Sequence, residues 1–501
     1  MFSRVAESRV GRFTVAKSKT LSYISSVLNR LPIISNEPPS PSGDVTLSDP
    51  VFAGADYVGP ERHSRRLYIE TFGCQMNQHD SDRIIGLMAA EGYARTTHPN
   101  EADLIVVNSC SVRDKAEQKL RTAAGQMKKF KRARPDTIIA LGGCVAQQEG
   151  QNLLDKVKHV DLVFGPDHLA RLPELITKIR TDRVRLNETV FLGRSEYVFP
   201  DIKKEAPIQY SAFVNVMKGC DKYCSFCVVP MTRGPEVSRP ADDIVREVQM
   251  LAAKGTKEVV LLGQTVNSYG RIRRQGQIPF HQLLARVCDV SGIERVRFTS
   301  PHPAEFSPEQ IQAFAELEQL CPHMHLPVQS GSTRVLRKMR RGYSREKFID
   351  ICHRFKEVVP HAGLTTDIIV GFPGETEEEF EETLSLMEEV RFHAAFSFAY
   401  SERKGTKALN IEESVPPDDR LRRLHKLQAL QERHTQDCLV DMVGNQETIM
   451  IEGPSKSDPT RSSGRSGNNR MVHVDGVFAP GTFIDVKIIE AFKHSLFAQA
   501  V

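Results

Sequence analysis

The stretch Lys218-Gly-Cys-Asp-Lys-Tyr-Cys-Ser-Phe-Cys227 places three thiols within eight residues, at positions 220, 224 and 227, and supplies no fourth. Structural zinc takes four closed ligands, commonly from two CxxC-type pairs, and a redox dithiol uses a two-cysteine motif beside a helix. A [4Fe-4S] cluster usually takes one thiolate per iron, so that three thiolates leave one iron open to an outside ligand. The CxxxCxxC spacing therefore favours such a cluster over zinc or a redox dithiol.

The composition of the whole chain indicates several domains in a reducing compartment. Its 501 residues, 40% of them apolar, are too many for one ordinary domain, so we expect two or three. Ten cysteines are too few for a disulfide scaffold in a chain of this length. No apolar run approaches the roughly 18 residues of a membrane span, so the sequence predicts a soluble protein without membrane contact. The cysteines that we expect to be small buried hydrophobes are Cys288, Cys321, Cys352 and Cys438.

The first 64 residues have a composition of their own. Residues 1–35 hold six Lys or Arg and a single acidic residue, Glu7, among many Ser and apolar positions. That bias is typical of a mitochondrial transit peptide. The stretch up to residue 64 includes Pro38-Pro-Ser-Pro41 and is interpreted as a linker. We therefore expect residues 1–64 to be a transit peptide and linker, and the protein to reside in the mitochondrial matrix.

The region of residues 65–200 contains strand-like segments that each end just before a cysteine, with helix-like segments at 81–91 and 113–129 between them. This β-α-β-α-β pattern predicts parallel strands, whose carboxyl ends share one edge of the sheet. The cysteines should therefore converge in space, although they are far apart in the sequence. The strands and the thiols that follow them are 67–72 with Cys74, 103–108 with Cys110, and 137–141 with Cys144.

Residues 205–435 repeat the β-α pattern six times, which predicts an open or incomplete (β/α)6 barrel with its site at the carboxyl ends of the strands. Helical segments such as 241–254 and 375–390 separate the strands. Because Cys220 follows the first strand, the three-cysteine loop should sit at the mouth of this barrel. The predicted strands are 212–217, 258–262, 295–299, 323–328, 364–370 and 394–400.

Residues 436–501 alternate like a small all-β barrel, with strand-like stretches at 447–452, 471–474 and 483–489. We expect the stretch between the first two, residues 461–470, to be a flexible basic loop that contacts RNA phosphates, the alternative being a packing domain with a mobile loop. Two more basic runs, 128–134 and 334–341, are further candidates for phosphate contact or simply solvated faces. The chain has no Trp, so base stacking should matter less than phosphate contact.

The CxxxCxxC loop with Phe226 before its last cysteine resembles the cluster loop of radical S-adenosylmethionine enzymes. From about Arg66 to its end the chain resembles one family among them, the methylthiotransferases, whose last domain is a TRAM domain. The other motifs behind this resemblance are Gly73-Cys-Gln-Met-Asn77, Val107-Asn-Ser-Cys-Ser-Val-Arg113, Gly142-Gly-Cys144, Arg233-Gly-Pro-Glu-Val-Ser-Arg239, Leu262-Gly-Gln-Thr-Val-Asn-Ser-Tyr269, His325-Leu-Pro-Val-Gln-Ser-Gly-Ser332 and Asp367-Ile-Ile-Val-Gly-Phe-Pro-Gly-Glu375.

The resemblance implies S-adenosylmethionine and two [4Fe-4S] clusters, one on Cys220, Cys224 and Cys227 and a second, auxiliary one on Cys74, Cys110 and Cys144. In this family S-adenosylmethionine is the source of a radical that activates an unreactive C–H carbon. A radical is needed because an aromatic C–H offers no acidic proton that a general base could remove. Strand ends and turns near the expected cofactor hold candidate contacts, for which core packing, turn or capping roles are the alternative. These candidates are Phe226, Gln264, Ser300, Gln329 and Asp367. Arg233 and Arg239 are interpreted either as holding a phosphate or the cofactor carboxylate, or as forming a surface salt bridge.

Finer resemblance favours the branch that converts N6-isopentenyladenosine at position 37 of tRNA to its 2-methylthio derivative, with the anticodon stem-loop as partner. A sister branch that acts on threonylcarbamoyladenosine commonly ends in a membrane anchor in eukaryotes, whereas this chain ends at Phe497-Ala-Gln-Ala-Val501. With the transit-like start, this favours mitochondrial tRNAs as substrates. The resemblance also admits a regulatory protein that binds the activator subunit of a cyclin-dependent kinase. Neither an electron donor nor a sulfur source is indicated.

Overall fold

The computed structural model describes residues 64–111, 114–200, 209–271, 277–456 and 458–501. The predicted transit peptide and linker, residues 1–64, therefore lie outside the described residues except for Ser64. Within the described ranges, none of the helices combines the length and the apolar character that a bilayer crossing requires.

A parallel α/β domain comes first, and it confirms the fold class predicted for this part of the chain. As far as the chain is described, its sheet has six strands in the order β2-β1-β3-β4-β5-β6. Every pair of neighbouring strands is parallel. The strands are β1 (Arg65–Phe72), β2 (Tyr93–Arg95), β3 (Leu104–Ser109), β4 (Ile138–Gly143), β5 (Leu162–Phe164) and β6 (Leu186–Glu188).

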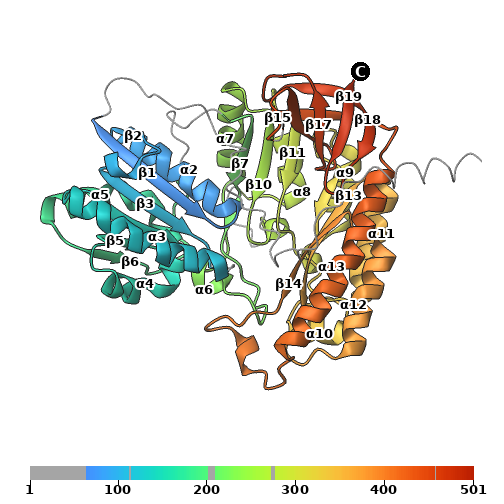
Figure 1. The fold of residues 1–501 in the computed structure, drawn as a ribbon, viewed down its shortest axis with the longest axis horizontal. Coiled ribbons are helices and arrows are strands. Elements are labelled where there is room, and N and C mark those ends of the chain that lie inside the picture. Colours follow the sequence, from blue (N-terminus) through green and yellow to red (C-terminus); the bar gives the residue numbers. More distant parts are fainter. Residues whose placement is uncertain (1–63, 112–113, 201–208, 272–276, 457) are drawn as a thin grey trace, which may run out of the picture. The chain divides into compact units, whose positions relative to one another are not determined.

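Helices cover both faces of this sheet (Figure 1). The apolar run of β3 explains the two layers, since Leu104 and Val106 pack under one pair of helices and Ile105 and Val107 under the other. The first pair is α2 (Gln75–Ala90) and α5 (Leu172–Asp182), and the second is α3 (Asp114–Ala133) and α4 (Cys144–Lys156).

Helix α2 begins at Gln75, six residues before the start predicted from the apolar pattern at Ser81. The prediction was wrong because the first turns of α2 bury polar side chains, among them Asn77, His79 and Asp80. Buried polar residues give no apolar periodicity. These side chains are buried because α2 packs against the next domain, as described below.

Six parallel strands, counted over the described residues, form the incomplete barrel that the sequence predicts. They pair as two sheets, β11-β10-β7 and β12-β13-β14, linked by a single parallel bridge between Val296 and Leu320. Strands β7 and β14 are therefore the two edges of the opened barrel. The strands are β7 (Ser211–Asn215), β10 (Glu258–Leu262), β11 (Arg295–Phe298), β12 (His323–His325), β13 (Gly363–Val370) and β14 (Ala394–Ala399).

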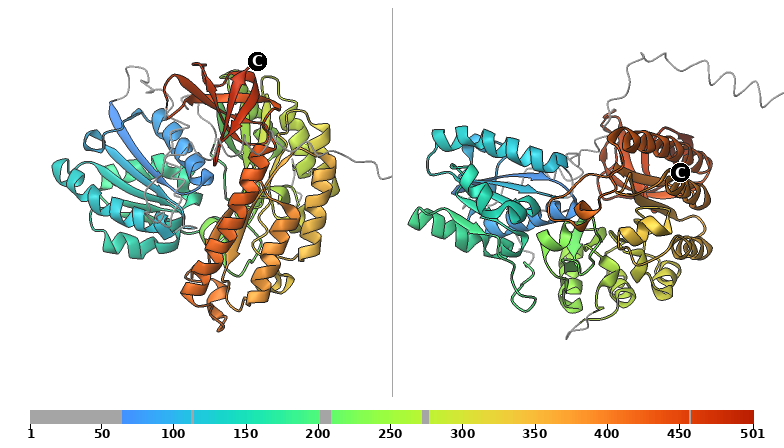
Figure 2. Two further views of the ribbon diagram at one scale, coloured as in Figure 1. Left: turned by 45° about the vertical axis from the view of Figure 1, so that its right-hand side comes forward. Right: turned by 90° about the horizontal axis from the view of Figure 1, so that it is seen from below.

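The outer faces of these strands pack on helices through the largest apolar core of the described chain. The helices of residues 345–440, yellow to orange in Figure 2, lie side by side along the barrel. The helices of this domain are α6 (Val229–Arg233), α7 (Ala241–Ala253), α8 (Phe280–Cys288), α9 (Pro308–Glu316), α10 (Thr333–Lys338), α11 (Arg345–Val358), α12 (Glu377–Val390) and α13 (Pro417–Val440). Short 3-10 helices join some of the elements: η1 (Pro99–Glu101), η2 (Pro166–Arg171), η3 (Val266–Ser268), η4 (Pro303–Glu305) and η5 (Lys407–Asn410).

The cysteine loop is framed by a short antiparallel ribbon of β8 (Met217–Lys218) and β9 (Val237–Ser238). The first barrel strand thus ends at Asn215, and the chain turns into the loop through Gly219, whose φ is +75°. A Cβ at position 219 would lie 2.1 Å from the carbonyl oxygen of Pro235. Only glycine fits at this position, which fixes where the loop leaves the barrel.

A closed barrel in the order β15-β16-β17-β19-β18 ends the described chain, as predicted. Two arginines of β11 attach it to the first barrel. Arg295 donates to the carbonyls of Arg465 (2.7 Å) and Thr448 (2.6 Å), and Arg297 donates to those of Gly467 (2.8 Å) and Ser466 (2.9 Å). The strands are β15 (Gln446–Pro454), β16 (Arg461–Ser466), β17 (Met471–Asp475), β18 (Phe483–Ala491) and β19 (Leu496–Ala500).

The prediction of a flexible basic loop at 461–470 was wrong, because most of that stretch is strand β16. The strand turns small side chains inward, with Ser462 and Ser466 fully buried, so it shows no apolar alternation. The arginines of residues 461–470 contact acids and carbonyls of the same chain. Arg461 pairs with Asp475 at 2.9 Å, Arg465 with Glu452 at 2.8 Å, and Arg470 donates to the His393 carbonyl at 2.9 Å.

The cysteines outside the two sets largely follow the sequence prediction. Cys288, Cys321 and Cys352 are buried, but Cys438 is only half-buried near the end of α13. A residue on one side of a surface helix keeps some exposure even when it is apolar.

Candidate functional site

The first set of thiols, Cys74, Cys110 and Cys144, lies at the carboxyl edge of the first sheet, after β1, β3 and β4. The Cys110 side chain is in hydrogen-bond contact with both Cys74 and Cys144. Close approach here requires glycine at position 73, since a Cβ there would lie 2.3 Å from the Cβ of Cys110. The structure thus brings the three thiols together as the parallel-strand argument predicts.

A buried arginine from the second domain lies against this first set. Arg233 is the last residue of α6, six positions after Cys227, and its Nη2 is 2.7 Å from Oδ2 of Asp80 on α2. The hydrogen bond to Cys110, and then the charge of Arg233, lower the pKa of Cys144 to about 6 and that of Cys74 to about 7, against the effect of burial. The site therefore favours thiolates at two of its three sulfurs.

More buried ion pairs tie α2 to the second domain around Arg233. Glu247 of α7 pairs with Arg83 of α2 and with Arg239. Although burial raises the pKa of the Glu247 carboxyl, the charges of Arg83 and Arg239 outweigh it and the net shift is downward. Arg233 and Arg239 do form salt bridges, but these are buried near the junction of the two domains, whereas the prediction placed a salt bridge at the surface.

The second set of thiols occupies the loop at the mouth of the barrel, and each sulfur has a hydrogen-bond partner. Cys220 Sγ lies 3.1 Å from Thr265 Oγ1, the Val229 N–H donates to Cys227 Sγ at 3.4 Å, and Arg341 Nη1 donates to Cys224 Sγ at 3.3 Å. Burial raises the pKa of Cys220, and it raises that of Cys227 to about 12. Thiolates at these two positions therefore need a bound cation to stabilise them.

Both sets fit an iron–sulfur cluster by the chemistry of their donors. Each supplies three thiols, and each has a guanidinium in contact with at least one sulfur. Over the residues that the structure describes, no three His, Cys, Asp or Glu side chains are arranged to bind a single metal ion. Three thiolates from each set would hold a cluster that takes one thiolate per iron, with one iron left open to an outside ligand.

Two of the predicted cofactor contacts have specific surroundings. Phe226 packs edge-on against Phe372, with ring centroids 6.4 Å apart, which is the core-packing alternative. Gln264, just after β10, has both amide atoms buried without a hydrogen-bond partner. A buried amide without partners is costly, so Gln264 fits a polar ligand such as S-adenosylmethionine. Its role as a cofactor contact remains a prediction.

Ser300 and Gln329 both have left-handed backbone, with φ of +60° and +73°. Such conformations are costly for residues other than glycine and gather at functional sites. Asp367 was predicted to stand at a strand end, but it lies inside β13, within the strand that the sequence already predicted over 364–370. Its Oδ1 lies 3.4 Å from Nε2 of His325.

The basic runs that are candidates for phosphate contact pair in part within the protein, while Lys128, Lys129 and Arg132 are exposed. Arg341 is buried against Cys224 and the Pro327 carbonyl, a role that its position in a basic run conceals. Thr265 was likewise missed, because a lone threonine gives no signal of its own. The other pairings are Lys131 with Asp161, Arg134 with Asp103, Arg334 with Glu379 and Lys338 with Glu413.

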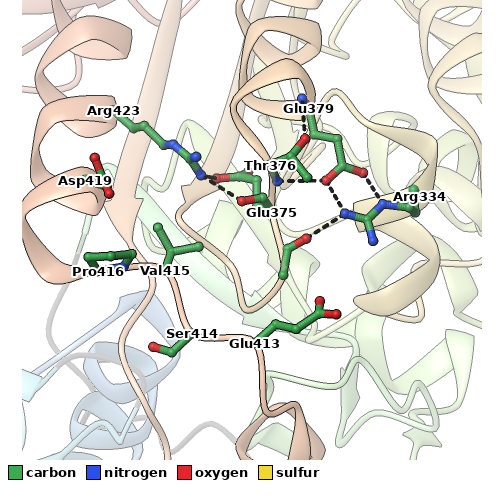
Figure 3. A pocket seen from close by; sticks show the side chains of 11 residues that line it. Arg334, Glu375, Thr376, Glu379, Glu413, Ser414, Val415, Pro416, Asp419 and Arg423 are labelled. Carbon is green, nitrogen blue, oxygen red and sulfur yellow. Dashed lines mark hydrogen bonds and ion pairs between the residues drawn. The ribbon is translucent and has the colours of Figure 1, made fainter.

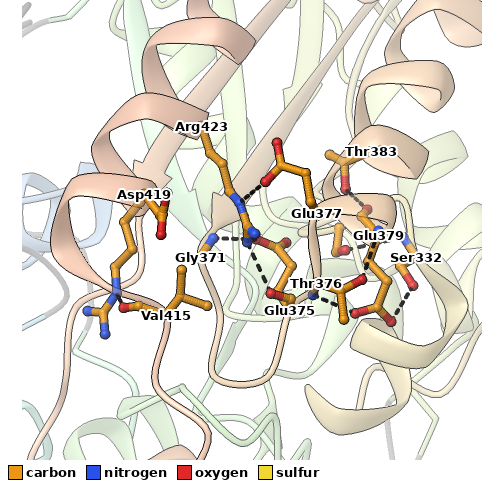
Figure 4. A network of polar contacts seen from close by, with 12 residues as sticks. Ser332, Gly371, Glu375, Thr376, Glu377, Glu379, Thr383, Val415, Asp419 and Arg423 are labelled. Atoms are coloured by element: carbon orange, nitrogen blue, oxygen red, sulfur yellow. Dashed lines mark hydrogen bonds and ion pairs between the residues drawn. The ribbon is translucent and has the colours of Figure 1, made fainter.

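A pocket of about 580 Å³ lies outside both cysteine sets, at the start of α12 (Figure 3). Glu375 is central to it, accepting from the Gly371 N–H at 2.6 Å and from Arg423 at 2.8 Å (Figure 4). Burial raises the pKa of Glu375 to about 7. The network ties the turn at Gly371 to α13. The charged residues lining the pocket are Arg334, Glu375, Glu379, Glu413, Asp419 and Arg423.

An incomplete (β/α)6 barrel with three thiols at its mouth defines a radical S-adenosylmethionine protein. The model of the radical SAM superfamily matches residues 214–387. The model described as uncharacterized protein family UPF0004 matches residues 66–165, and that of the TRAM domain matches residues 440–501. These matches fall on the three regions described above.

Curated relatives show which family of radical S-adenosylmethionine proteins this chain resembles. A tRNA-2-methylthio-N(6)-dimethylallyladenosine synthase of Burkholderia multivorans is 43% identical over 458 residues, covering 87% of this chain and 97% of its own. The protein of that name from Myxococcus xanthus is 47% identical over 441 residues, covering 87% and 94%. The chain therefore belongs to the radical S-adenosylmethionine methylthiotransferase family.

Among solved structures, a radical S-adenosylmethionine methyltransferase, TsrM of Kitasatospora setae with cobalamin and a [4Fe-4S] cluster bound, is similar with a TM-score of 0.50 and 15% identity. The match covers 67% of this chain and 72% of that one. At this identity the likeness supports the fold and nothing finer.

Proposed function

We propose that the protein transfers a methylthio group to C2 of N6-isopentenyladenosine at position 37 of mitochondrial tRNAs. The observation that supports this best is the pair of three-thiol sets, one at the carboxyl edge of the first sheet and one at the mouth of the barrel, since one cluster can serve radical formation and the other sulfur delivery. The names of the relatives from Burkholderia multivorans and Myxococcus xanthus, which specify the dimethylallyl substrate, support the choice of nucleoside.

Cys220, Cys224 and Cys227 would hold the cluster that binds S-adenosylmethionine, and Cys74, Cys110 and Cys144 the auxiliary one. When bound, these groups supply a hydrogen-abstracting radical and a sulfur for transfer. Through their hydrogen bonds, Arg341 orients the sulfur of Cys224 and Thr265 that of Cys220. The Gln264 amide offers a donor and an acceptor to the polar part of the cofactor.

The two sets border the same interior, which suits a reaction that must be kept from water. Cys74 and Met76 pack with Phe213, Val260 and Leu262, which lie on the barrel faces of β7 and β10 away from the helices. The auxiliary set therefore faces the inside of the barrel. Buried ion pairs between α2 and α7 keep it there.

The remaining parts of the proposal concern partner and compartment. The closed C-terminal barrel, matched by the TRAM model, would grip the anticodon stem-loop. The basic, acid-poor residues 1–35 support import into the mitochondrial matrix. Binding to a kinase activator finds no support in the names of the relatives and is not proposed here.

The test is nucleoside mass spectrometry after anaerobic incubation of the reconstituted protein with S-adenosylmethionine, a reductant and an isopentenylated anticodon stem-loop. The expected product is 2-methylthio-N6-isopentenyladenosine, absent with Cys74→Ala. A stem-loop with threonylcarbamoyladenosine is the matched substrate control. Conversion of that control in preference to the isopentenylated RNA would overturn the proposed substrate.

A further inference from the structure

The inner face of the second half-barrel carries aromatic side chains that the chemistry above does not use. Along β13, Leu364, Ile368 and Val370 enter the core shared with the helices, so the alternate residues Thr365, Asp367 and Ile369 face the barrel interior. Strand β14 is in register with β13, pairing Phe396 with Asp367 and Phe398 with Ile369. Both phenylalanines therefore face inward.

These two rings are unusually open for the inside of a barrel. Phe396 is 50% exposed and Phe398 is 45% exposed. Ala395, whose side chain points to the opposite face of β14, instead packs against the apolar core between the strands and the helices. The interior of a closed barrel is normally filled by its own side chains. Because β14 is an edge strand of the opened barrel, its inner face borders the opening. Two half-exposed rings there form an apolar wall beside the opening of the barrel.

Neighbouring polar groups fix the orientation of Phe396. The ring of His325 meets it edge-on, with centroids 5.9 Å apart. His325 is itself held at both nitrogens, by Thr365 Oγ1 at 2.9 Å and by Asp367 Oδ1 at 3.4 Å. The wall is therefore preorganised, which favours a rigid, partly apolar ligand over a flexible one.

We propose that Phe396 and Phe398 read the isopentenyl group of the target nucleoside and so determine substrate specificity. The inference rests on the proposed function. Burial of a branched C5 hydrocarbon against two rings is favourable, because it removes apolar surface from water. A threonylcarbamoyl group carries a carboxylate, which would lose hydration against the same wall. His325 is a positioning residue, acting through Phe396.

The test measures binding of the full, anaerobically reconstituted chain to two labelled stem-loops that differ only in the isopentenyl group, without S-adenosylmethionine. The wild-type protein should prefer the isopentenylated RNA, and Phe396→Ala or Phe398→Ala should reduce that preference about tenfold or more. Binding of the unmodified RNA should stay the same. Leu421→Ala, at an exposed apolar position on α13, is the matched control and should leave both affinities unchanged.

The outcomes separate this inference from the proposed function. If the wild-type protein binds both stem-loops equally, or if the phenylalanine variants weaken both equally, Phe396 and Phe398 do not read the isopentenyl group. If the preference exists and the variants lose it while the wild-type protein forms no methylthio product, the inference stands and the proposed reaction fails. His325→Gln should lower the preference for the isopentenylated RNA less than Phe396→Ala, because it removes the contact that orients Phe396 and leaves both phenylalanine rings in place.

Discussion

Replacing Arg233 by methionine tests whether the junction between the first two domains depends on a buried charge. The Arg233 and Asp80 side chains are only 6% and 11% exposed, and their atoms are 2.7 Å apart. The variant leaves Asp80 buried, with His79 Nδ1 3.8 Å from its Oδ1. Removing one partner of a buried pair costs about 3–5 kcal/mol, against about 0–1 kcal/mol for an exposed pair.

The measurement is urea denaturation of the cluster-free protein followed by circular dichroism, since the chain has no Trp for fluorescence. Arg233→Met should lose about 3–5 kcal/mol, a large part of the stability of an ordinary domain. The double variant with Asp80→Asn should lose less than the single one, because no buried charge is left unpaired. A single-variant loss below about 1 kcal/mol, or a double variant less stable than the single, would refute the reasoning.

The same variant predicts an effect on the first set of thiols alone. Without Arg233, the pKa values of Cys144 and Cys74 should rise, and iron should bind less firmly there. Iron bound to Cys220, Cys224 and Cys227 should be unaffected. Iron analysis in a background with those three cysteines replaced by alanine isolates the effect, and undiminished iron in the Arg233→Met form of that background would contradict it.

Further predictions concern four other sites. Gln264→Ala should leave the cluster-free protein as stable as before or more so, because the amide has no partner, yet weaken S-adenosylmethionine binding about tenfold by calorimetry; unchanged affinity would remove Gln264 from the site. Burial and nearby positive charges lower the pKa of His302 to about 2 and of His393 to about 3. The unfolded chain binds these protons below about pH 6.5, so each histidine should cost roughly 1.4 kcal/mol per pH unit below that value. Melting temperatures at pH 8 and pH 5 check this, and the corresponding glutamine variants should flatten the slope. Arg423→Leu should cost about 3–5 kcal/mol at pH 8 in urea denaturation, with much of it recovered by adding Glu375→Gln, whereas a loss no greater than that of a surface pair would contradict the prediction.

The sequence predicts the strands and the cysteines of this protein well, because both depend on local pattern. Apolar runs such as Leu104–Val107 mark buried parallel strands, and a thiol after each strand must lie at the shared edge of the sheet. The convergence of Cys74, Cys110 and Cys144 follows from topology alone. The order of the barrel strands was predictable for the same reason.

What the sequence does not reveal depends on contacts between distant segments. Strand β16 is formed by Ser, Gly and Arg, whose pairing partners decide its conformation. Arg341 looks like part of a basic run but is buried against Cys224. Phe396 and Phe398 are half-exposed, unlike core phenylalanines, because they lie on the edge strand where the barrel opens. Such features follow from tertiary packing, which a single sequence does not specify.

The most direct test of the account is iron and sulfide analysis with Mössbauer spectroscopy on the reconstituted chain and two triple variants. One variant replaces Cys74, Cys110 and Cys144 by alanine, and the other replaces Cys220, Cys224 and Cys227. Two independent clusters predict about eight irons in the wild-type protein and about four in each variant, all as [4Fe-4S]. Circular dichroism shows whether each variant is folded. A wild-type protein with only about four irons, or a folded variant that keeps all of its iron, would contradict the central claim that this chain holds two separate clusters.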